Sequence, residues 1–229
     1  MPTKLQKFAE FKTFPNAFTY LYDDFLISEK KFEHYNLWNK NFFQNNHPIV
    51  IEIGCGRGEY TVGLAEHFKD KNFIGIDCKS NRMWKGAKYA VEKKLSNVAF
   101  LRTRVEFLEK VLAPDEVSEI WITFPDPHER KSRAKNRLTH PKFLKLYKKF
   151  LKENGIIHLK TDNNILFEFT LEVLQNLNIQ PLQLSFDISK ETQPEWEYIK
   201  NIKTYYEQLF SEKGHTIKYC CFKISNANL

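Results

Sequence analysis

The sequence predicts an α/β protein: a single Rossmann-like domain with a mostly parallel sheet of about seven strands and helices on both faces. Short apolar runs alternate with amphipathic stretches, which is the pattern of strands followed by crossover helices. The apolar runs lack polar alternation, as expected of strands buried on both faces. The 229 residues, 42% of them hydrophobic, are enough for one large core. We assign residues 1–46 to an N-terminal extension with a helix, and residues 47–229 to the α/β domain.

The first half of that domain is expected to alternate strand and helix. Helical spacing of apolar side chains predicts one helix through 62–68 and another through 83–91. Short apolar runs on either side of these helices are predicted to be strands. The expected strands span 47–54, 72–77, 97–102 and 119–124.

The second half continues the alternation after a loop at 125–139 that is rich in proline, arginine and lysine. Pro141 suits the first turn of a helix, because proline lacks only an amide hydrogen that would be unpaired there. An aromatic-rich stretch at 196–213, followed by Gly214, predicts a late helix. The other expected elements are a strand at 155–161, a helix at 165–177, a sixth strand at 181–188 and a last strand at 215–224.

The positive charge of the chain is concentrated in one segment. The net charge is +7, and residues 128–152 contribute +9, from ten Lys and Arg residues and Glu129, so the remainder carries −2. A local basic patch on a near-neutral body predicts a polyanionic partner. The half of the segment that follows Pro141 has a second interpretation, a solvated lysine-rich helix face.

Several classes of protein are excluded. No run of 18 uncharged apolar residues is present, so no transmembrane helix is expected, and the N-terminus lacks the apolar stretch of a secretory signal. The cysteines form no C-x-x-C pair, which argues against a zinc site or a disulfide framework. We therefore expect a cytoplasmic protein without a metal site or a membrane anchor. The cysteines are Cys55, Cys78, Cys220 and Cys221.

The loop after the first strand is typical of a cofactor site. Three glycines lie within five residues, at Gly54, Gly56 and Gly58, and glycine allows tight turns and close approach of a ligand. Glu59 occupies the third glycine position of a dinucleotide fingerprint, and the G-K-[ST] of a phosphate-binding loop is absent. Glu52, just before the loop, suits the ammonium end of an amino acid better than a pyrophosphate. A tight turn without a ligand and a nicotinamide-dependent enzyme are the alternatives.

An acid at the end of the second strand completes this pattern. Asp77 can accept both ribose hydroxyls of a nucleoside. The sequence E-I-G-x-G-x-G after a strand, with this distal acid, resembles motif I of the class I S-adenosylmethionine-dependent methyltransferases.

The fourth strand ends in Pro125-Asp126-Pro127. The two prolines fix the backbone on either side of Asp126, so its carboxylate is held rigidly at the tip of the strand. An ordinary strand-ending turn is the alternative. The loop HERKSRAKNRLT at 128–139 has no apolar face for a helix to bury, which favours contacts with phosphates.

Two further strand and helix ends carry polar side chains. Thr161-Asp162 ends the fifth strand, where Asp162 can bind a ligand or cap the helix that starts near Ile165. Thr204 and Glu207 lie three residues apart on one helical face, so a hydroxyl and a carboxylate could hold the edge of a base. A surface pair is the alternative.

Taken in order, EIGCGRGEYT, FIGIDCK, FPDPHERKSRAKNR, LKTDN and TYYE resemble the bacterial tRNA (guanine-N7)-methyltransferase family over about residues 48–210. The resemblance implies methyl transfer from S-adenosylmethionine to N7 of guanine 46 in the variable loop of tRNA. The positive charge of segment 128–152 makes it the expected tRNA contact, and the sequence leaves both a monomer and a homodimer open. Methylation of another RNA, and RNA binding by a protein with a decayed cofactor pocket, are the alternative functions.

The resemblance assigns roles to individual residues. Asp126 matches the catalytic aspartate. The implied cofactor-binding residues are Glu52, Gly54, Gly56, Gly58, Asp77, Arg104 and Asp126. The implied substrate-binding residues are Arg130, Asp162, Thr204 and Glu207.

Three positions depart from the family pattern. His128 replaces the usual Trp after Pro-Asp-Pro, which changes any stacking there. Arg130 replaces a Lys, which keeps the charge and alters the geometry. Arg104 stands where the family usually has an acid, so a contact with the adenine is expected from its backbone.

Overall fold

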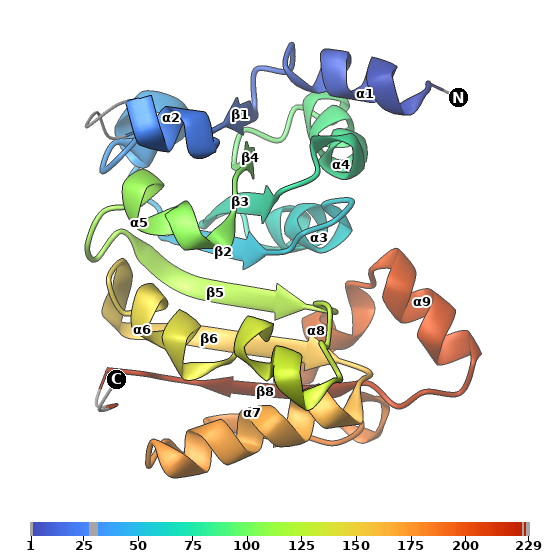
Figure 1. Cartoon of the computed structure of the whole chain (residues 1–229). Coiled ribbons are helices and arrows are strands. Elements are labelled where there is room, and N and C mark those ends of the chain that lie inside the picture. The colour runs from blue at the N-terminus through green and yellow to red at the C-terminus, as the bar shows by residue number, and fades with distance from the viewer. Residues whose placement is uncertain (1, 28–31, 226, 228–229) are drawn as a thin grey trace.

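The computed structural model describes residues 2–27, 32–225 and 227, and within them eight strands form one sheet in the order β1-β4-β3-β2-β5-β6-β8-β7 (Figure 1). The six strands from β1 to β6 pair in parallel, and β8 and β7 complete the sheet in antiparallel orientation. This confirms the predicted α/β fold. The strands are β1 Ala17–Thr19, β2 Ile49–Ile53, β3 Asn72–Asp77, β4 Val98–Arg102, β5 Val117–Thr123, β6 Leu151–Thr161, β7 Gln183–Ser185 and β8 Lys218–Phe222.

Alternation along each strand divides the core into two layers. In β2, Ile49, Ile51 and Ile53 face one layer, which α5, α6 and α7 cover. Val50 faces the other layer, which α3, α4 and α8 cover. The α-helices of the described residues are α1 Lys4–Phe11, α2 Tyr22–Ile27, α3 Glu59–His67, α4 Ser80–Glu92, α5 Leu108–Val111, α6 Pro141–Tyr147, α7 Asn164–Asn176, α8 Glu197–Asn201 and α9 Tyr205–Glu212.

The described part of residues 1–46 packs onto this sheet. β1 pairs in parallel with β4 and forms one edge of the sheet. Trp38 is fully buried in the first core layer. Helix α1 lies on α4, where Trp84 Nε1 donates to Glu10 Oε2 at 2.9 Å.

The predicted helix over 196–213 is wrong as a single element, because the chain breaks between α8 and α9. Thr204 takes an extended conformation and caps α9, its hydroxyl accepting from the Glu207 amide at 3.1 Å. At the break, the carbonyls of Ile199 and Ile202 accept from Lys160 Nζ. A contact from a distant strand therefore ends α8, and no local pattern predicts it.

Other boundaries differ from the prediction in smaller ways. The expected strand at 181–188 is confined to β7, and the loop at 125–139 contains a short 3-10 helix at Lys131–Asn136. Asn163 caps α7 in place of Asp162, its side chain accepting from the Leu166 amide at 2.9 Å. Within the described residues, the helices are too short or too polar to cross a membrane.

Candidate cofactor and substrate site

A cavity of about 380 Å³ opens at the carboxyl ends of β2, β3 and β5, on the side of the sheet where α9 lies in Figure 1. A second cavity of about 370 Å³ adjoins it, and the two share Gly54, Asp77, Cys78 and Leu138. Together they form an elongated site at the position where ligands bind in open α/β sheets. The first cavity is lined by Gly54, Cys55, Gly56, Arg57, Glu59, Asp77, Cys78, Lys79, Arg82, Thr123, Phe124, Pro125, Asp126, His128, Asn136, Leu138, Thr204 and Tyr206.

The glycine loop has the backbone conformation that its sequence requires. Gly54, Gly56 and Gly58 have φ values of 78°, 56° and 75°, a backbone conformation that residues other than glycine rarely adopt. A Cβ on Gly58 would also lie 2.5 Å from the Phe100 ring. The Gly56 amide donates to Asp77 Oδ2 at 3.0 Å, so the loop is tied to the end of β3.

Glu52 is buried beneath this loop and is not among the residues that line either cavity. Its carboxylate accepts from the Thr61 amide at 2.8 Å and from the hydroxyls of Thr61 and Thr123. Burial raises the pKa of Glu52 to about 7. The carboxylate thus joins the start of α3 to the end of β5, and its contact with an ammonium group stays a prediction.

The second cavity is lined by Arg104 and by two residues that the sequence analysis missed, Thr103 and Glu106. The Arg104 side chain is largely exposed and lies 3.4 Å from Glu106. The Thr103 hydroxyl is buried without a hydrogen-bond partner in the described structure. Such an orphaned group is typical of a ligand site. Thr103 directly follows β4. Ligands of parallel sheets bind at the carboxyl ends of strands, so the end of the third predicted strand would have indicated this residue.

Asp126 lies at the mouth of the first cavity and is exposed. The residues that flank its Pro-Asp-Pro turn, Phe124 and His128, have positive φ values of 45° and 43°. Non-glycine residues in this region are strained, and such strain concentrates at functional sites. The Phe124 amide donates to Lys160 O at 2.9 Å, which fixes the start of the turn to β6.

The basic loop borders the same cavity through His128, Asn136 and Leu138. Arg137 is buried, and its guanidinium donates to the carbonyls of Pro127, His128 and Glu129 at 3.1 to 3.3 Å. It therefore holds the loop in shape. The other cations of the loop are exposed, namely Arg130, Lys131, Arg133 and Lys135.

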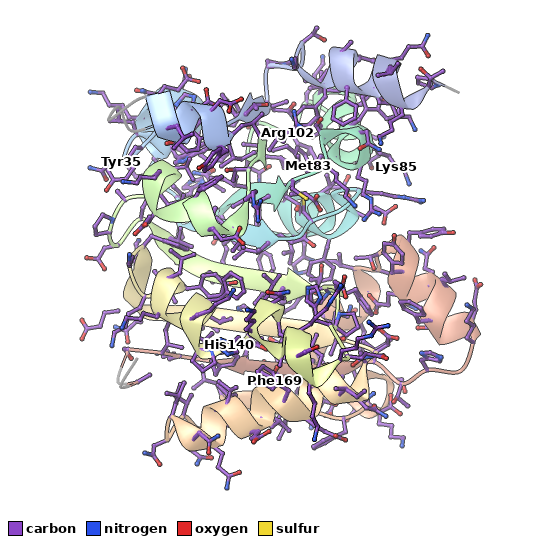
Figure 2. The ribbon with its side chains drawn as sticks, in the orientation of Figure 1. Tyr35, Met83, Lys85, Arg102, His140 and Phe169 are labelled. Atoms are coloured by element: carbon purple, nitrogen blue, oxygen red, sulfur yellow. The ribbon has the colours of Figure 1, made fainter. Side chains whose placement is uncertain are left out.

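An aromatic layer supports the buried guanidinium. The Arg137 guanidinium lies 4.5 Å from the centre of the Phe169 ring. Figure 2 shows Phe169, on α7, next to His140, and their rings stack with centroids 6.2 Å apart. Past the end of α6, the exposed Lys149 pairs with Glu109 at the surface.

The structure brings only part of the predicted substrate set to the cavity. Thr204 lines it, together with Tyr206, which the sequence analysis missed. Arg130, Asp162 and Glu207 do not line it. Asp162 Oδ2 lies 3.1 Å from His215 Nδ1, and the Glu207 carboxylate is buried 2.8 Å from Lys160 Nζ. Among the described residues, no group of three or more His, Cys, Asp or Glu is placed to hold a metal ion.

The sheet order, the glycine loop and the acid at the end of β3 define a class I methyltransferase. A solved antibiotic-related methyltransferase has the same fold, with a TM-score of 0.59, 18% identity and coverage of 82% of this chain and 92% of its own. A 16S rRNA methyltransferase, KamB, also matches with a TM-score of 0.59, at 13% identity over 80% of this chain and 91% of its own. The family described as "Putative methyltransferase" matches residues 46–220.

Bacterial relatives extend the likeness over almost the whole chain. The tRNA (guanine-N(7)-)-methyltransferase of Christiangramia forsetii is 47% identical, over 96% of this chain and 97% of its own. The enzyme of that name from Porphyromonas gingivalis is 49% identical, over 92% and 85%. The chain belongs to the tRNA (guanine-N7)-methyltransferase family. It is an enzyme, and its methyl donor is S-adenosylmethionine.

Proposed function

We propose that this chain transfers the methyl group of S-adenosylmethionine to N7 of a guanine in tRNA. The observation that carries the proposal is the position of Asp126, which is exposed and lines the same cavity as the glycine loop and the Arg- and Lys-rich loop. A small-molecule methyltransferase would not need a basic loop at this place. The names of the relatives support tRNA as the substrate.

The residues present fit the cofactor. The left-handed loop at Gly54–Gly58 leaves room for the methionine part, and Asp77 offers acceptors to the ribose. The second cavity, with the orphaned hydroxyl of Thr103 and with Glu106 and the Arg104 backbone, would take the adenine. The cofactor supplies a methyl group that is made electrophilic by the sulfonium to which it is bonded.

In this reaction the main task of the protein is to align guanine N7 with the methyl group of the cofactor. N7 of guanine has a free lone pair and no proton, so no general base is required. Holding N7 in line with the reacting bond can be worth about 7–11 kcal/mol of the barrier. Positive charge passes to the purine during transfer, and the fixed carboxylate of Asp126 stabilises it.

The guanine edge with N1–H and the N2 amine presents donors, which carboxylates can read. In this proposal Asp162 and Thr204 contact the substrate, and Arg130 with the neighbouring exposed cations holds phosphates. The expected target is guanine 46 of the variable loop, and the enzyme is expected to act in the cytoplasm as a monomer or homodimer.

The direct test is to incubate the purified protein with methyl-labelled S-adenosylmethionine and unmodified tRNA transcripts, then to digest the RNA and identify the labelled nucleoside. We expect label in 7-methylguanosine, and none from a transcript in which guanine 46 is replaced by adenine. Label in another nucleoside would contradict the assignment of the target atom. Absence of both label and cofactor binding would support a decayed cofactor pocket.

A further inference from the structure

Lys160, on β6, carries a buried amino group that the proposed reaction does not use. Its side chain has no exposed surface. The Nζ atom lies 2.8 Å from Glu207 Oε2, donates to Ile202 O at 3.1 Å and also donates to Ile199 O. The two carbonyls accept hydrogen bonds from the ammonium, and the Glu207 carboxylate balances its charge as an ion pair.

All three partners of the ammonium, the two carbonyls and the Glu207 carboxylate, belong to one segment, 199–207. Ile199 is in α8, Ile202 follows its end, and Glu207 is in the first turn of α9. Between them lies Thr204, which lines the first cavity, and Tyr206 lines it too. The ammonium group therefore bonds the backbone before the residues that reach the cavity and pairs with the side chain that follows them.

The backbone of Lys160 holds the opposite wall of the cavity. Its carbonyl accepts from the Phe124 amide at 2.9 Å, directly before the Pro-Asp-Pro turn that carries Asp126. One residue thus joins the Asp126 turn to the segment that carries Thr204 and Tyr206. The ring of Tyr60, in α3, lies beneath the ammonium, 5.1 Å from ring centre to Nζ.

Stability alone is a weak reason for this arrangement. Burying an ammonium and a carboxylate costs desolvation free energy that their attraction repays only partly, so apolar residues of similar volume often serve stability as well or better. What an apolar pair cannot do is bond the two carbonyls at the helix break. The benefit of a lysine at this position is a single defined path for segment 199–207.

We propose that Lys160 is a positioning residue: it holds segment 199–207 against β6 so that Thr204 and Tyr206 meet the tRNA substrate, and Glu207 serves as its buried counter-charge. This inference rests on the proposed function for its tRNA readout. It gives Glu207 a role different from reading the guanine edge, because its carboxylate would have to leave Lys160 to reach the cavity.

The test compares wild-type protein with the double variant K160M/E207Q, which removes the anchor without leaving a carboxylate buried and unpaired. We expect the KM for tRNA to rise about tenfold or more, since small misplacements of positioning groups have effects of this size. The Kd for S-adenosylmethionine should stay within about twofold, because the cofactor loop is not anchored by Lys160. The melting temperature should exceed that of K160M alone.

Two single variants complete the design. E207Q leaves Lys160 bonded to both carbonyls and removes only the counter-charge, so its KM for tRNA should rise less than that of the double variant. K71M is the matched control: it removes the Lys71–Glu119 ion pair, with its 2.6 Å distance, at the amino ends of the strands. It should alter stability and leave the KM for tRNA unchanged.

Hydrogen exchange provides a readout that is independent of activity. Amides in 199–207 should exchange faster in K160M/E207Q than in wild type, while those of the Gly54–Gly58 loop keep their rates. A double variant with wild-type KM and wild-type exchange would overturn the proposal. E207Q raising KM as much as the double variant would overturn it too, and would assign Glu207 to base recognition. Wild-type protein that does not methylate tRNA would remove the proposed function and leave the exchange test decisive.

Discussion

The backbone amide of His128 donates to Asp126 Oδ1 at 3.1 Å, so the carboxylate turns back on its own loop and is held by the residue two positions later. His128 itself has a positive φ of 43°. The carboxylate is thereby fixed before any substrate arrives, which is the condition for effective electrostatic stabilisation of a developing charge.

Replacing this carboxylate should affect turnover more than binding. We expect Asp126→Ala to lower kcat by about 100-fold, the usual cost of losing one preorganised group at the reacting centre. The Kd for tRNA should stay within about threefold, because phosphate contacts dominate that affinity. Single-turnover kinetics and filter binding give the two values. Unchanged turnover would remove Asp126 from the mechanism.

The exposed and buried arginines of the basic loop should respond differently to truncation. Arg133→Ala should reduce the slope of log Kd for tRNA against log salt by about one, with an unchanged melting temperature. Arg137→Ala should lower the melting temperature, because it strips three loop carbonyls of their donor. Binding that does not change between low and moderate salt would contradict the assignment of this loop to phosphates.

Tyr206 is expected to supply the stacking surface that His128 does not. Its ring is about two-fifths exposed at the cavity and is backed by the Phe210 ring, with centroids 6.2 Å apart. Tyr206→Ala should raise the KM for tRNA about tenfold, since stacking of one base on an aromatic ring is worth about 1–3 kcal/mol. Tyr206→Phe, which keeps the ring, should behave as wild type. Equal effects of the two substitutions would exclude stacking.

Buried Glu52 should make stability depend on pH. Its folded pKa of about 7 lies above the unfolded value of 4.5, so the folded state holds a proton that the unfolded state releases. The stabilising effect is therefore complete below pH 4.5 and is lost as the pH rises through 7. The stability of Glu52→Gln relative to wild type should increase between pH 5 and pH 8 by about 2 kcal/mol. Denaturant titrations at both pH values measure this difference, and a constant difference would contradict it.

Periodicity predicts the central strands of this protein well because their pattern is set by burial on two faces. β2 and β3 fall within the ranges expected for them. The glycine loop and Asp77 meet because the carboxyl ends of neighbouring parallel strands lie at one edge of the sheet. β1 was not predicted, because a strand of three residues at the edge of the sheet is too short to show an alternating pattern. The break between α8 and α9 escapes it because Lys160 lies 39 residues from Ile199 in sequence.

The number of charged residues in a segment also does not predict which of them are exposed. Arg137 and Arg133 look equivalent in the sequence, yet the fold turns one inward to bond carbonyls and leaves the other exposed. Glu207 is an acidic residue that the fold likewise turns inward. Its partner, Lys160, comes from β6 and cannot be inferred from the Thr204–Glu207 spacing. Local patterns place residues on elements, whereas long-range contacts decide which of those residues reach the site.

Cys78 lines both cavities and is exposed, while Cys55, Cys220 and Cys221 are buried. The native enzyme therefore carries one accessible thiol at the junction of its two cavities, and a maleimide dye would report occupancy without engineered labels. Partial desolvation and the neighbouring Asp77 carboxylate raise the pKa of this thiol, so its labelling near neutral pH should be slower than that of a fully solvated cysteine. Protection of Cys78 by cofactor, titrated as fluorescence, would yield affinities for unlabelled analogues and a simple screen for inhibitors.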